Sequence, residues 1–325
     1  MSKKTAYKID TKEFVTIGGI PQNIRIRTND PSLPVLLFVH GGPGVCDRFW
    51  VMSHQSGLAD CATIVCWDQR CAGLTYNPKE NYDGITVERM LDDAGEVAAH
   101  LKERFNKDKI IIVGHSWGSL LGALLAQKYP EHIGAYIGMG QLADGPENEM
   151  LSYRYVLEQA NERNDKKALK ELKKIGWPQN GLFRTLDDFM IQRKWLGTFG
   201  GGTYGAKEST VKMLLIPLLK SPEYNLSGLI RYIKGGLTSI KYFWNVVPTY
   251  NLCNTIKELK MPVYMTIGRH DYNTPASIAQ KWYDGLKAPS KKWIWFENSA
   301  HAPIKEEAEK WQAEVKEIIR TCGVA

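Results

Sequence analysis

The chain has 325 residues, of which 43% are hydrophobic, so it is long enough to bury a substantial core. Its net charge of +7 comes from 42 basic and 35 acidic residues without any block of about five basic ones, which argues against a nucleic-acid partner. No run of about 18 apolar residues occurs, and the N-terminus lacks the apolar segment of a signal peptide. We therefore expect a soluble, cytoplasmic protein without a membrane partner.

The cysteines are scattered along the chain without a C-x-x-C pair or a histidine-rich neighbourhood. This spacing is not that of a zinc site, and reduced thiols are the default in the cytoplasm. We therefore expect no metal ion, and the side-chain chemistry described below needs no organic cofactor. The sequence makes no prediction about the oligomeric state.

The first part of the chain predicts strands that lead to a glycine-rich loop. Short strands are expected at residues 13–16 and 22–27, and the apolar run 35–39 is a third. This run ends in H-G-G-P-G, a loop that begins at His40 and that no side chains can crowd. Its backbone N–H groups can turn toward a developing oxyanion. We expect Gly42 to be the donor, with Gly41 as the near alternative.

The next elements predict a candidate nucleophile. A strand at residues 62–67 and a helix at about 86–105 precede the β-branched run 109–113. That run continues into G-H-S-W-G-S and then into an apolar helix, which is the strand, sharp turn and helix that a nucleophile elbow requires. Ser116 is therefore the predicted nucleophile. The N–H of Trp117, directly after it, is the predicted second oxyanion donor.

After a predicted strand at residues 133–139, no strand-like pattern occurs between residue 141 and about residue 251. Helical patterns at residues 149–164, 166–174, 186–194 and 210–219 predict a helical cap insertion over 141–251, between core segments 1–140 and 252–325. Three glycines at 200–202 predict either a hinge of this cap or an ordinary loop. The aromatic residues of the cap that we expect to line a substrate pocket are Trp195, Phe199, Tyr204, Phe243, Trp244 and Tyr250.

The last part of the chain supplies an acid and a base. A strand that starts near residue 261 ends at Asp271, and a strand at 292–297 is followed by the loop that carries His301. We expect His301 to be the general base and Asp271 to orient it, because a serine hydroxyl needs such a pair to become nucleophilic. The rivals are His270, whose side chain should project the other way in an extended segment, and Asp284, which lies far along a helix.

Strands that alternate with helices predict an α/β fold, with a mostly parallel sheet and helices on both faces. Ligands of such sheets bind at the carboxyl ends of the strands. The glycine-rich loop and the three candidate residues Ser116, Asp271 and His301 all follow strands directly. One topology therefore brings four distant motifs to one edge.

These motifs resemble the α/β-hydrolase superfamily and, within it, the proline iminopeptidase-like branch. H-G-G-P-G, W-D-Q-R at residues 67–70, G-H-S-W-G-S, G-R-H-D and A-H-A-P follow the order of that branch. Two features depart from it. The branch usually continues D-Q-R with G-x-G-x-S, whereas this chain reads C-A-G-L-T at residues 71–75. The W-x-x-W-E-like cap segment, whose acid helps to recognise a substrate's amino group, is not found.

The resemblance implies a serine hydrolase that transfers an acyl group to water, and its best specific form is an aminopeptidase acting on a short peptide. Such an enzyme needs a cap acid, for which Asp144, Glu147 and Glu149 are the nearest candidates. The alternative is a carboxylesterase or lactonase acting on a small molecule in an aromatic cap pocket. A non-catalytic small-molecule receptor on the same fold is the third possibility. Serine at the elbow argues against an epoxide hydrolase or dehalogenase, which use aspartate there.

Overall fold

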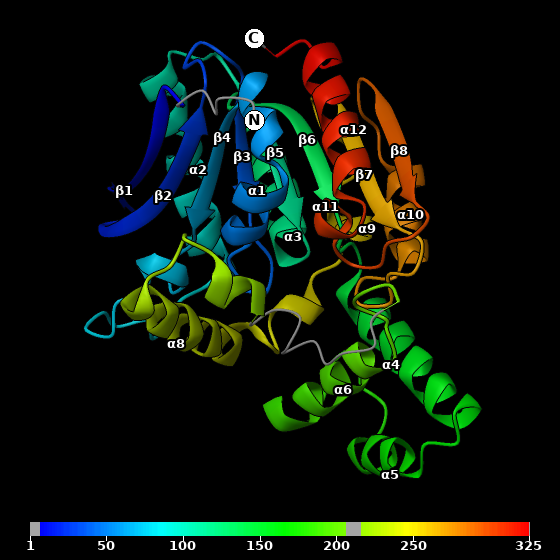
Figure 1. The fold of residues 1–325 in the computed structure, drawn as a ribbon. Helices are drawn as coiled ribbons and strands as arrows, with labels where there is room; N and C mark the ends of the chain where they lie inside the picture. Colours follow the sequence, from blue (N-terminus) through cyan, green and yellow to red (C-terminus); the bar gives the residue numbers. More distant parts are fainter. Residues whose placement is uncertain (1–6, 206–215, 325) are drawn as a thin grey trace, which may run out of the picture.

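The computed structural model describes residues 7–205 and 216–324, and within them the core is one eight-stranded sheet (Figure 1). The strand order is β1-β2-β4-β3-β5-β6-β7-β8, in which β1, β2 and β4 pair antiparallel and all later pairs are parallel. The predicted α/β-hydrolase fold is confirmed. The strands are β1 Ile9–Ile17, β2 Ile20–Thr28, β3 Val35–Val39, β4 Thr63–Asp68, β5 Ile110–His115, β6 Ile133–Met139, β7 Val263–Gly268 and β8 Lys291–Phe296.

Helices cover both faces of the sheet, because successive residues of a buried strand point to opposite faces. Leu37 and Ile112 pack in the cluster that includes α2 and α3, whereas Phe38 and Ile111 pack against α1 and α12. Each buried strand therefore reads as a continuous apolar run. The core helices are α1 Arg48–His54, α2 Val87–Phe105, α3 Trp117–Lys128, α9 Leu252–Thr255, α10 Ala276–Gly285, α11 Pro303–Glu306 and α12 Ala308–Thr321.

The register of the parallel strands brings their carboxyl ends together. Val39 of β3 pairs with Gly114 of β5, and His115 at the end of β5 pairs with Met139 of β6. Met139 in turn pairs with Thr266 of β7. The loops that follow these strands therefore leave the sheet at one edge, where the sequence analysis places the reactive residues.

Between β6 and β7 the chain forms helices without a strand of the main sheet among the described residues. They lie beyond the carboxyl ends of the strands, with α8 under one half of the sheet and α4 to α6 under the other (Figure 1). The helix predicted at 210–219 falls mostly outside the described residues. That residues 141–251 form a separate cap stays a prediction. The helices are α4 Gly145–Glu162, α5 Lys166–Ile175, α6 Leu186–Thr198 and α8 Leu226–Phe243.

The segment of three glycines at residues 200–202 packs against its neighbours. Gly201 is packed, because a Cβ atom there would lie 2.5 Å from Leu196 and 2.7 Å from Tyr155. Its carbonyl accepts the N–H of Tyr272, so the glycine segment is tied to the loop after β7.

Within the described parts of the chain, no helix combines the length and the apolar character that a bilayer crossing requires.

Candidate active site

The turn from β5 to α3 has the geometry of a nucleophile elbow. Ser116 has φ 57° and ψ −121°, a conformation that non-glycine residues rarely adopt. The flanking glycines make the turn possible, since a Cβ at Gly118 would lie 1.9 Å from the carbonyl oxygen of Val39 and one at Gly114 would lie 2.4 Å from that of Gly118. Ser116 is half-buried and stands directly before the first turn of α3. The elbow therefore presents its hydroxyl at the sheet edge.

Asp271 and His301 meet across the ends of β7 and β8. The Nδ1 atom of His301 lies 2.9 Å from Oδ2 of Asp271, and the Asp271 side chain is fully buried. Asp271 Oδ1 accepts the backbone N–H groups of Asn273 and Thr274, both at 2.9 Å, and Oδ2 accepts the Thr274 hydroxyl at 2.8 Å. These donors hold the carboxylate as an acceptor, so His301 donates from Nδ1 and its Nε2 carries the lone pair.

The rival residues lie elsewhere. His270 stacks on Tyr204, with ring centroids 4.3 Å apart, and Asp284 is exposed near the end of α10. Among the described residues, no hydrogen bond joins the Ser116 hydroxyl to His301. Such contacts are often long before substrate binds and tighten only in the complex. The same part of the chain holds no group of three or more His, Cys, Asp or Glu side chains arranged for a metal ion.

The glycine-rich loop after β3 lies against the elbow. A Cβ at Gly41 would lie 3.0 Å from Cβ of Ser116, so a side chain here would push on the serine. Gly42 has φ 111°, a conformation that favours glycine, and it lines the same pocket as Ser116 and Trp117. Trp117 begins α3, where a backbone N–H has no acceptor within the helix. Both predicted oxyanion donors are therefore adjacent to Ser116.

Gln69, which follows β4, ties the loop to the elbow. Its Oε1 accepts the indole N–H of Trp117 at 2.9 Å, and its Nε2 donates to the carbonyl of His40 at 2.9 Å. His40 Nε2 accepts the N–H of Gln69, so its Nδ1 donates to the Gly41 carbonyl. Burial lowers the pKa of His40, in agreement with this neutral form. The D-Q-R motif was the sequence signal for this bridge.

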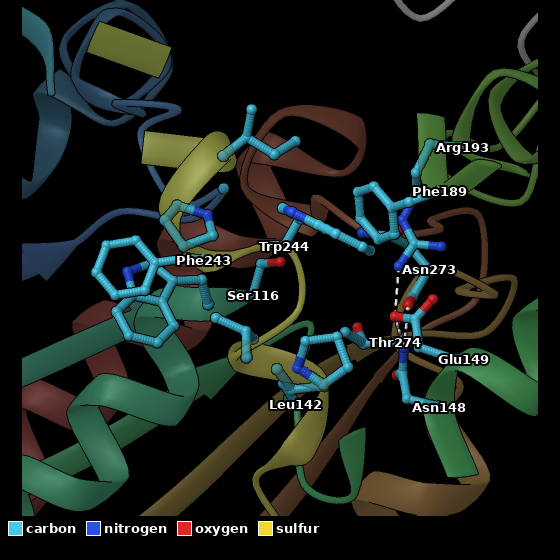
Figure 2. Close-up of a pocket in the computed structure, with 16 residues that line it drawn as sticks. Ser116, Leu142, Asn148, Glu149, Phe189, Arg193, Phe243, Trp244, Asn273 and Thr274 are labelled. Atoms are coloured by element: carbon cyan, nitrogen blue, oxygen red, sulfur yellow. Dashed lines mark hydrogen bonds and ion pairs between the residues drawn. The ribbon is translucent and has the colours of Figure 1, made fainter. Parts of the chain in front are cut away.

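A pocket opens above Ser116, between the core and the helices α4, α5, α6 and α8 that lie between β6 and β7, which together are called the helical segment. Ser116 lies in the middle of its wall, with Phe243 on one side and Glu149, Asn273 and Arg193 on the other (Figure 2). The residues that line it are Gly42, Pro43, Ser116, Trp117, Leu142, Asn148, Glu149, Phe189, Arg193, Ile240, Phe243, Trp244, Val247, Pro248, Asn273 and Thr274.

Glu149 is the acid of this pocket. Its Oε1 forms an ion pair with Arg193 Nη2 at 2.5 Å and accepts a longer bond, 3.4 Å, from Asn148 Nδ2. Its Oε2 is buried and has no partner among the described residues. A buried carboxylate oxygen without a donor is costly, which makes this atom a candidate acceptor for a bound molecule.

The model of the family described as the alpha/beta hydrolase fold matches residues 34–308. The chain belongs to the α/β-hydrolase family. It is 31% identical over 90% of its length to a Bacillus subtilis protein named probable aminopeptidase YbaC, of which the match covers 91%. It is 23% identical over 96% of its length to a proline iminopeptidase of Saccharolobus solfataricus, covering 94% of that protein. The proline iminopeptidase-like resemblance is confirmed.

Among solved structures, the fold resembles that of the esterase RhEst1 from Rhodococcus, with a TM-score of 0.63. That match has 15% sequence identity and covers 97% of this chain and all of the other, so it speaks for the fold alone. The protein is thus a hydrolase of the α/β-hydrolase fold. Its relatives by sequence are named probable aminopeptidase and proline iminopeptidase, and one of its structural neighbours is named esterase.

Several residues predicted to bind substrate in this hydrolase lie away from the pocket. Trp195 and Phe199 stack on each other, with centroids 5.4 Å apart, in the apolar cluster between α4, α5 and α6. On α6 the pocket residues Phe189 and Arg193 are one turn apart, and Trp195 is about 200° further round the helix. The opposite face of α6 therefore reaches the pocket. This placement corrects the expectation for Trp195 and Phe199.

Two of the three candidate cap acids at the start of α4, Asp144 and Glu147, also lie away from the pocket. Asp144 caps the helix, because it accepts the N–H of Glu147 at 3.2 Å and the side-chain amide of Asn251 at 2.7 Å. Glu147 forms an exposed ion pair with Lys281 at 3.0 Å. Glu149, two residues further, takes the pocket position.

Of the remaining aromatic residues that were expected to line the pocket, some do and some do not. Tyr204 stacks on His270, and its N–H donates to Glu306, so it borders the loops after β7 and β8 without lining the pocket. Tyr250 donates to Glu88 on the outside of α2. Phe243 and Trp244, by contrast, do line the pocket beside Ser116.

Proposed function

We propose that this protein is a serine aminopeptidase that removes the N-terminal residue of a short peptide. The observation that carries the proposal is the free oxygen of Glu149 in the pocket of Ser116. An ammonium group is the natural donor for a buried carboxylate oxygen. The relatives named aminopeptidase and proline iminopeptidase agree with this choice.

The proposed reaction is acyl transfer to water in two steps. His301 Nε2 takes the proton of the Ser116 hydroxyl while Oγ attacks the carbonyl carbon, and Asp271 stabilises the imidazolium that forms. The N–H groups of Gly42 and Trp117 stabilise the oxyanion. His301 then protonates the leaving amine, and afterwards activates the water that hydrolyses the acyl-enzyme. Each proton passes through His301, so no cofactor enters the scheme.

Glu149 explains why a free amine would be preferred. Arg193 already compensates part of its charge through Oε1, which leaves Oε2 for the substrate's ammonium group. An N-acetylated substrate has no positive charge to pair with Oε2, and a neutral amide N–H makes a weaker bond than an ammonium group. An N-acetylprolyl substrate has no N–H at its acylated nitrogen and would leave the buried oxygen without a donor, which typically costs about 1–3 kcal/mol.

A second candidate function is ester hydrolysis, and the apolar character of the pocket favours it. Much of the wall beside Ser116 could hold an alkyl or aromatic acyl group without any polar anchor. The same triad would serve this reaction unchanged. The apolar residues of this wall are Leu142, Phe189, Ile240, Phe243, Trp244 and Val247.

Glu149→Gln separates the two functions. We expect kcat/KM for free-amine aminoacyl arylamides, prolyl ones above all, to fall about a hundredfold, because the ammonium loses a charged partner in a buried site. Hydrolysis of p-nitrophenyl esters by the same variant should stay within a few-fold, which also shows that the variant is folded. The assay compares free-amine arylamides, their N-acetylated counterparts and the esters.

Glu147→Gln is the matched control, since Glu147 lies on the same helix but pairs with Lys281 at the surface. We expect this variant to cleave the arylamides like the parent. Ester turnover without any cleavage of free-amine arylamides by the parent enzyme would discard the aminopeptidase and leave the esterase. The roles of Ser116, Asp271 and His301 would not be affected by that result.

A further inference from the structure

His115, the residue before Ser116, connects two loops of the active site. It is buried at the end of β5, where its Nδ1 lies 2.8 Å from Oδ2 of Asp47. On the other side of the ring, its Nε2 lies 3.0 Å from the backbone carbonyl oxygen of His301. Asp47 directly precedes α1 and follows the glycine-rich loop. One imidazole therefore joins the Asp47 side chain to the loop that carries the proposed base.

The two partners of His115 decide how many protons the pair holds. A carbonyl oxygen can only accept a hydrogen bond, and so can a carboxylate. Both ring nitrogens therefore need a proton, either as an imidazolium beside the Asp47 carboxylate or with the Nδ1 proton shared with Asp47. A neutral imidazole beside a carboxylate has one proton too few for both bonds. The geometry thus requires one proton more than an ordinary neutral histidine and an ionised aspartate carry.

The charges around His115 favour this extra proton. Burial opposes a charge on the ring, but the Asp47 carboxylate and the hydrogen bonds outweigh it and raise the pKa of His115 above its ordinary value. Because the pKa is raised, the proton is held at lower pH and is lost as the pH rises through the folded-state value. The other titratable and charged groups that face the His115–Asp47 pair are His40, Cys46, Tyr232, Asp271, His301 and Lys305.

We propose that His115, kept doubly protonated by Asp47, is a positioning residue that fixes the His301 loop, and that loss of its Nε2 proton at alkaline pH weakens catalysis. The Nε2 proton is the one lost, because the Asp47 carboxylate retains the proton on Nδ1. The lone pair on Nε2 then faces the carbonyl of His301 and repels it. This inference rests on the proposed roles of Ser116 and His301 but not on the identity of the substrate.

Other contacts hold the same loop, so the effect should be partial. The Glu306 carboxylate accepts the N–H groups of Ala300 at 2.9 Å and Ala302 at 3.2 Å, on either side of His301. His115 is the partner of the intervening carbonyl. Its loss would therefore tilt the imidazole of His301 without unfolding the loop, and a small misplacement is enough to slow proton transfer.

The first test is the pH dependence of Ser116 labelling by a fluorophosphonate. The probe has no amine, so a fall of its second-order rate constant at alkaline pH, measured at known probe concentration, comes from the protein. We expect the labelling rate to fall at alkaline pH as His115 loses its Nε2 proton. In Asp47→Asn the alkaline fall should disappear, because the asparagine amide can donate to Nδ1 and leave the single proton of a neutral His115 on Nε2, where it still reaches the His301 carbonyl.

Three variants make this test specific. His115→Gln keeps an amide N–H that does not titrate, so its alkaline fall should disappear. Asp93→Asn removes another buried carboxylate, one that pairs with Arg70 and Arg89 and makes no contact with His115, and should leave the profile unchanged. Burial lowers the pKa of Lys305, which makes it the competing alkaline group, and Lys305→Gln should retain the fall. The Asp47 side chain makes no capping bond to α1, so Asp47→Asn should fold.

The second test observes the histidine directly. In the 15N spectrum of the protein labelled at histidine, both ring nitrogens of His115 should be protonated near neutral pH. In Asp47→Asn, His115 should lose its second proton at lower pH than in the parent. A single protonated nitrogen at neutral pH would overturn the proposal, and so would an alkaline fall that Asp47→Asn leaves in place or that Lys305→Gln removes. Absence of arylamide cleavage would refute the aminopeptidase alone, because neither test uses that substrate.

Discussion

Replacing Ser116 by alanine is expected to lower kcat/KM for every substrate of this enzyme by about four to six orders of magnitude. The expected size follows from the loss of covalent catalysis, which oxyanion donors and binding alone replace only in small part. The fold should tolerate the change, since Ser116 is half-buried and its strained backbone is fixed by Gly114 and Gly118. Steady-state kinetics with the best ester or arylamide measures the effect.

The unfolding midpoint of Ser116→Ala serves as the control for this result. We expect it to lie close to that of the parent, because the described residues offer no hydrogen bond to the Ser116 hydroxyl. A variant that is folded and retains more than a hundredth of the parent's activity would contradict the role of Ser116. In that case the hydrolysis would have to proceed through another nucleophile.

Asp271→Asn is expected to lower kcat about ten-thousandfold. The backbone N–H groups of Asn273 and Thr274 will hold the amide oxygen where Oδ1 now lies, so the amide nitrogen faces His301 and donates to Nδ1. His301 must then carry its proton on Nε2, where it cannot accept the proton of Ser116. The fold should persist, because asparagine has almost the same shape. Kinetics in the neutral range and the unfolding midpoint measure both parts of this expectation.

His270→Ala is the matched control, because His270 is the neighbour of Asp271 but stacks on Tyr204. It should retain most of the turnover, whereas His301→Ala should lose nearly all of it. Equal losses in the two histidine variants would show that the base is assigned wrongly. If kcat of Asp271→Asn falls less than tenfold, Asp271 does not set the tautomer of His301.

The core of this enzyme could be predicted from sequence because its signals are local. The central parallel strands β3, β5, β6 and β7 are buried on both faces and read as apolar runs. The chain leaves each of these runs through glycines or polar residues at one edge of the sheet. Ser116 and the loop at Gly42 lie inside such signals. Asp271 and His301 could be placed because each lies in the loop that follows a strand, although their contact joins residues that are thirty positions apart.

The pocket could not be predicted in the same way, because the orientation of its helices depends on tertiary packing. The sequence around an aromatic residue such as Trp195 does not show whether its side chain faces Ser116 or the interior of the helical segment. Only the packing of α6 on α4 and α5 decides that Phe189 and Arg193 face the pocket. Glu149 was one of three candidate acids, and its free oxygen became visible only once its neighbours were placed.

Asp47 carried no sequence signal at all, and a histidine inside the elbow motif gave no reason to search for its partner. The pairing of Asp47 with His115 joins residues that are 68 positions apart. It arises because β3 and β5 are neighbours in the sheet, so the loops that follow them meet. Contacts of this kind depend on strand order, which local sequence patterns do not specify.

The most direct test of the account is the site at which a fluorophosphonate modifies the folded protein. Peptide mapping by mass spectrometry should place a single adduct on Ser116, because the strained elbow, the base His301 and the donors at Gly42 and Trp117 activate that hydroxyl alone. The adduct should be absent in Ser116→Ala and should form slowly in Asp271→Asn. An adduct on another residue, or no adduct on protein that is shown to be folded, would contradict the account and favour a receptor on the hydrolase fold.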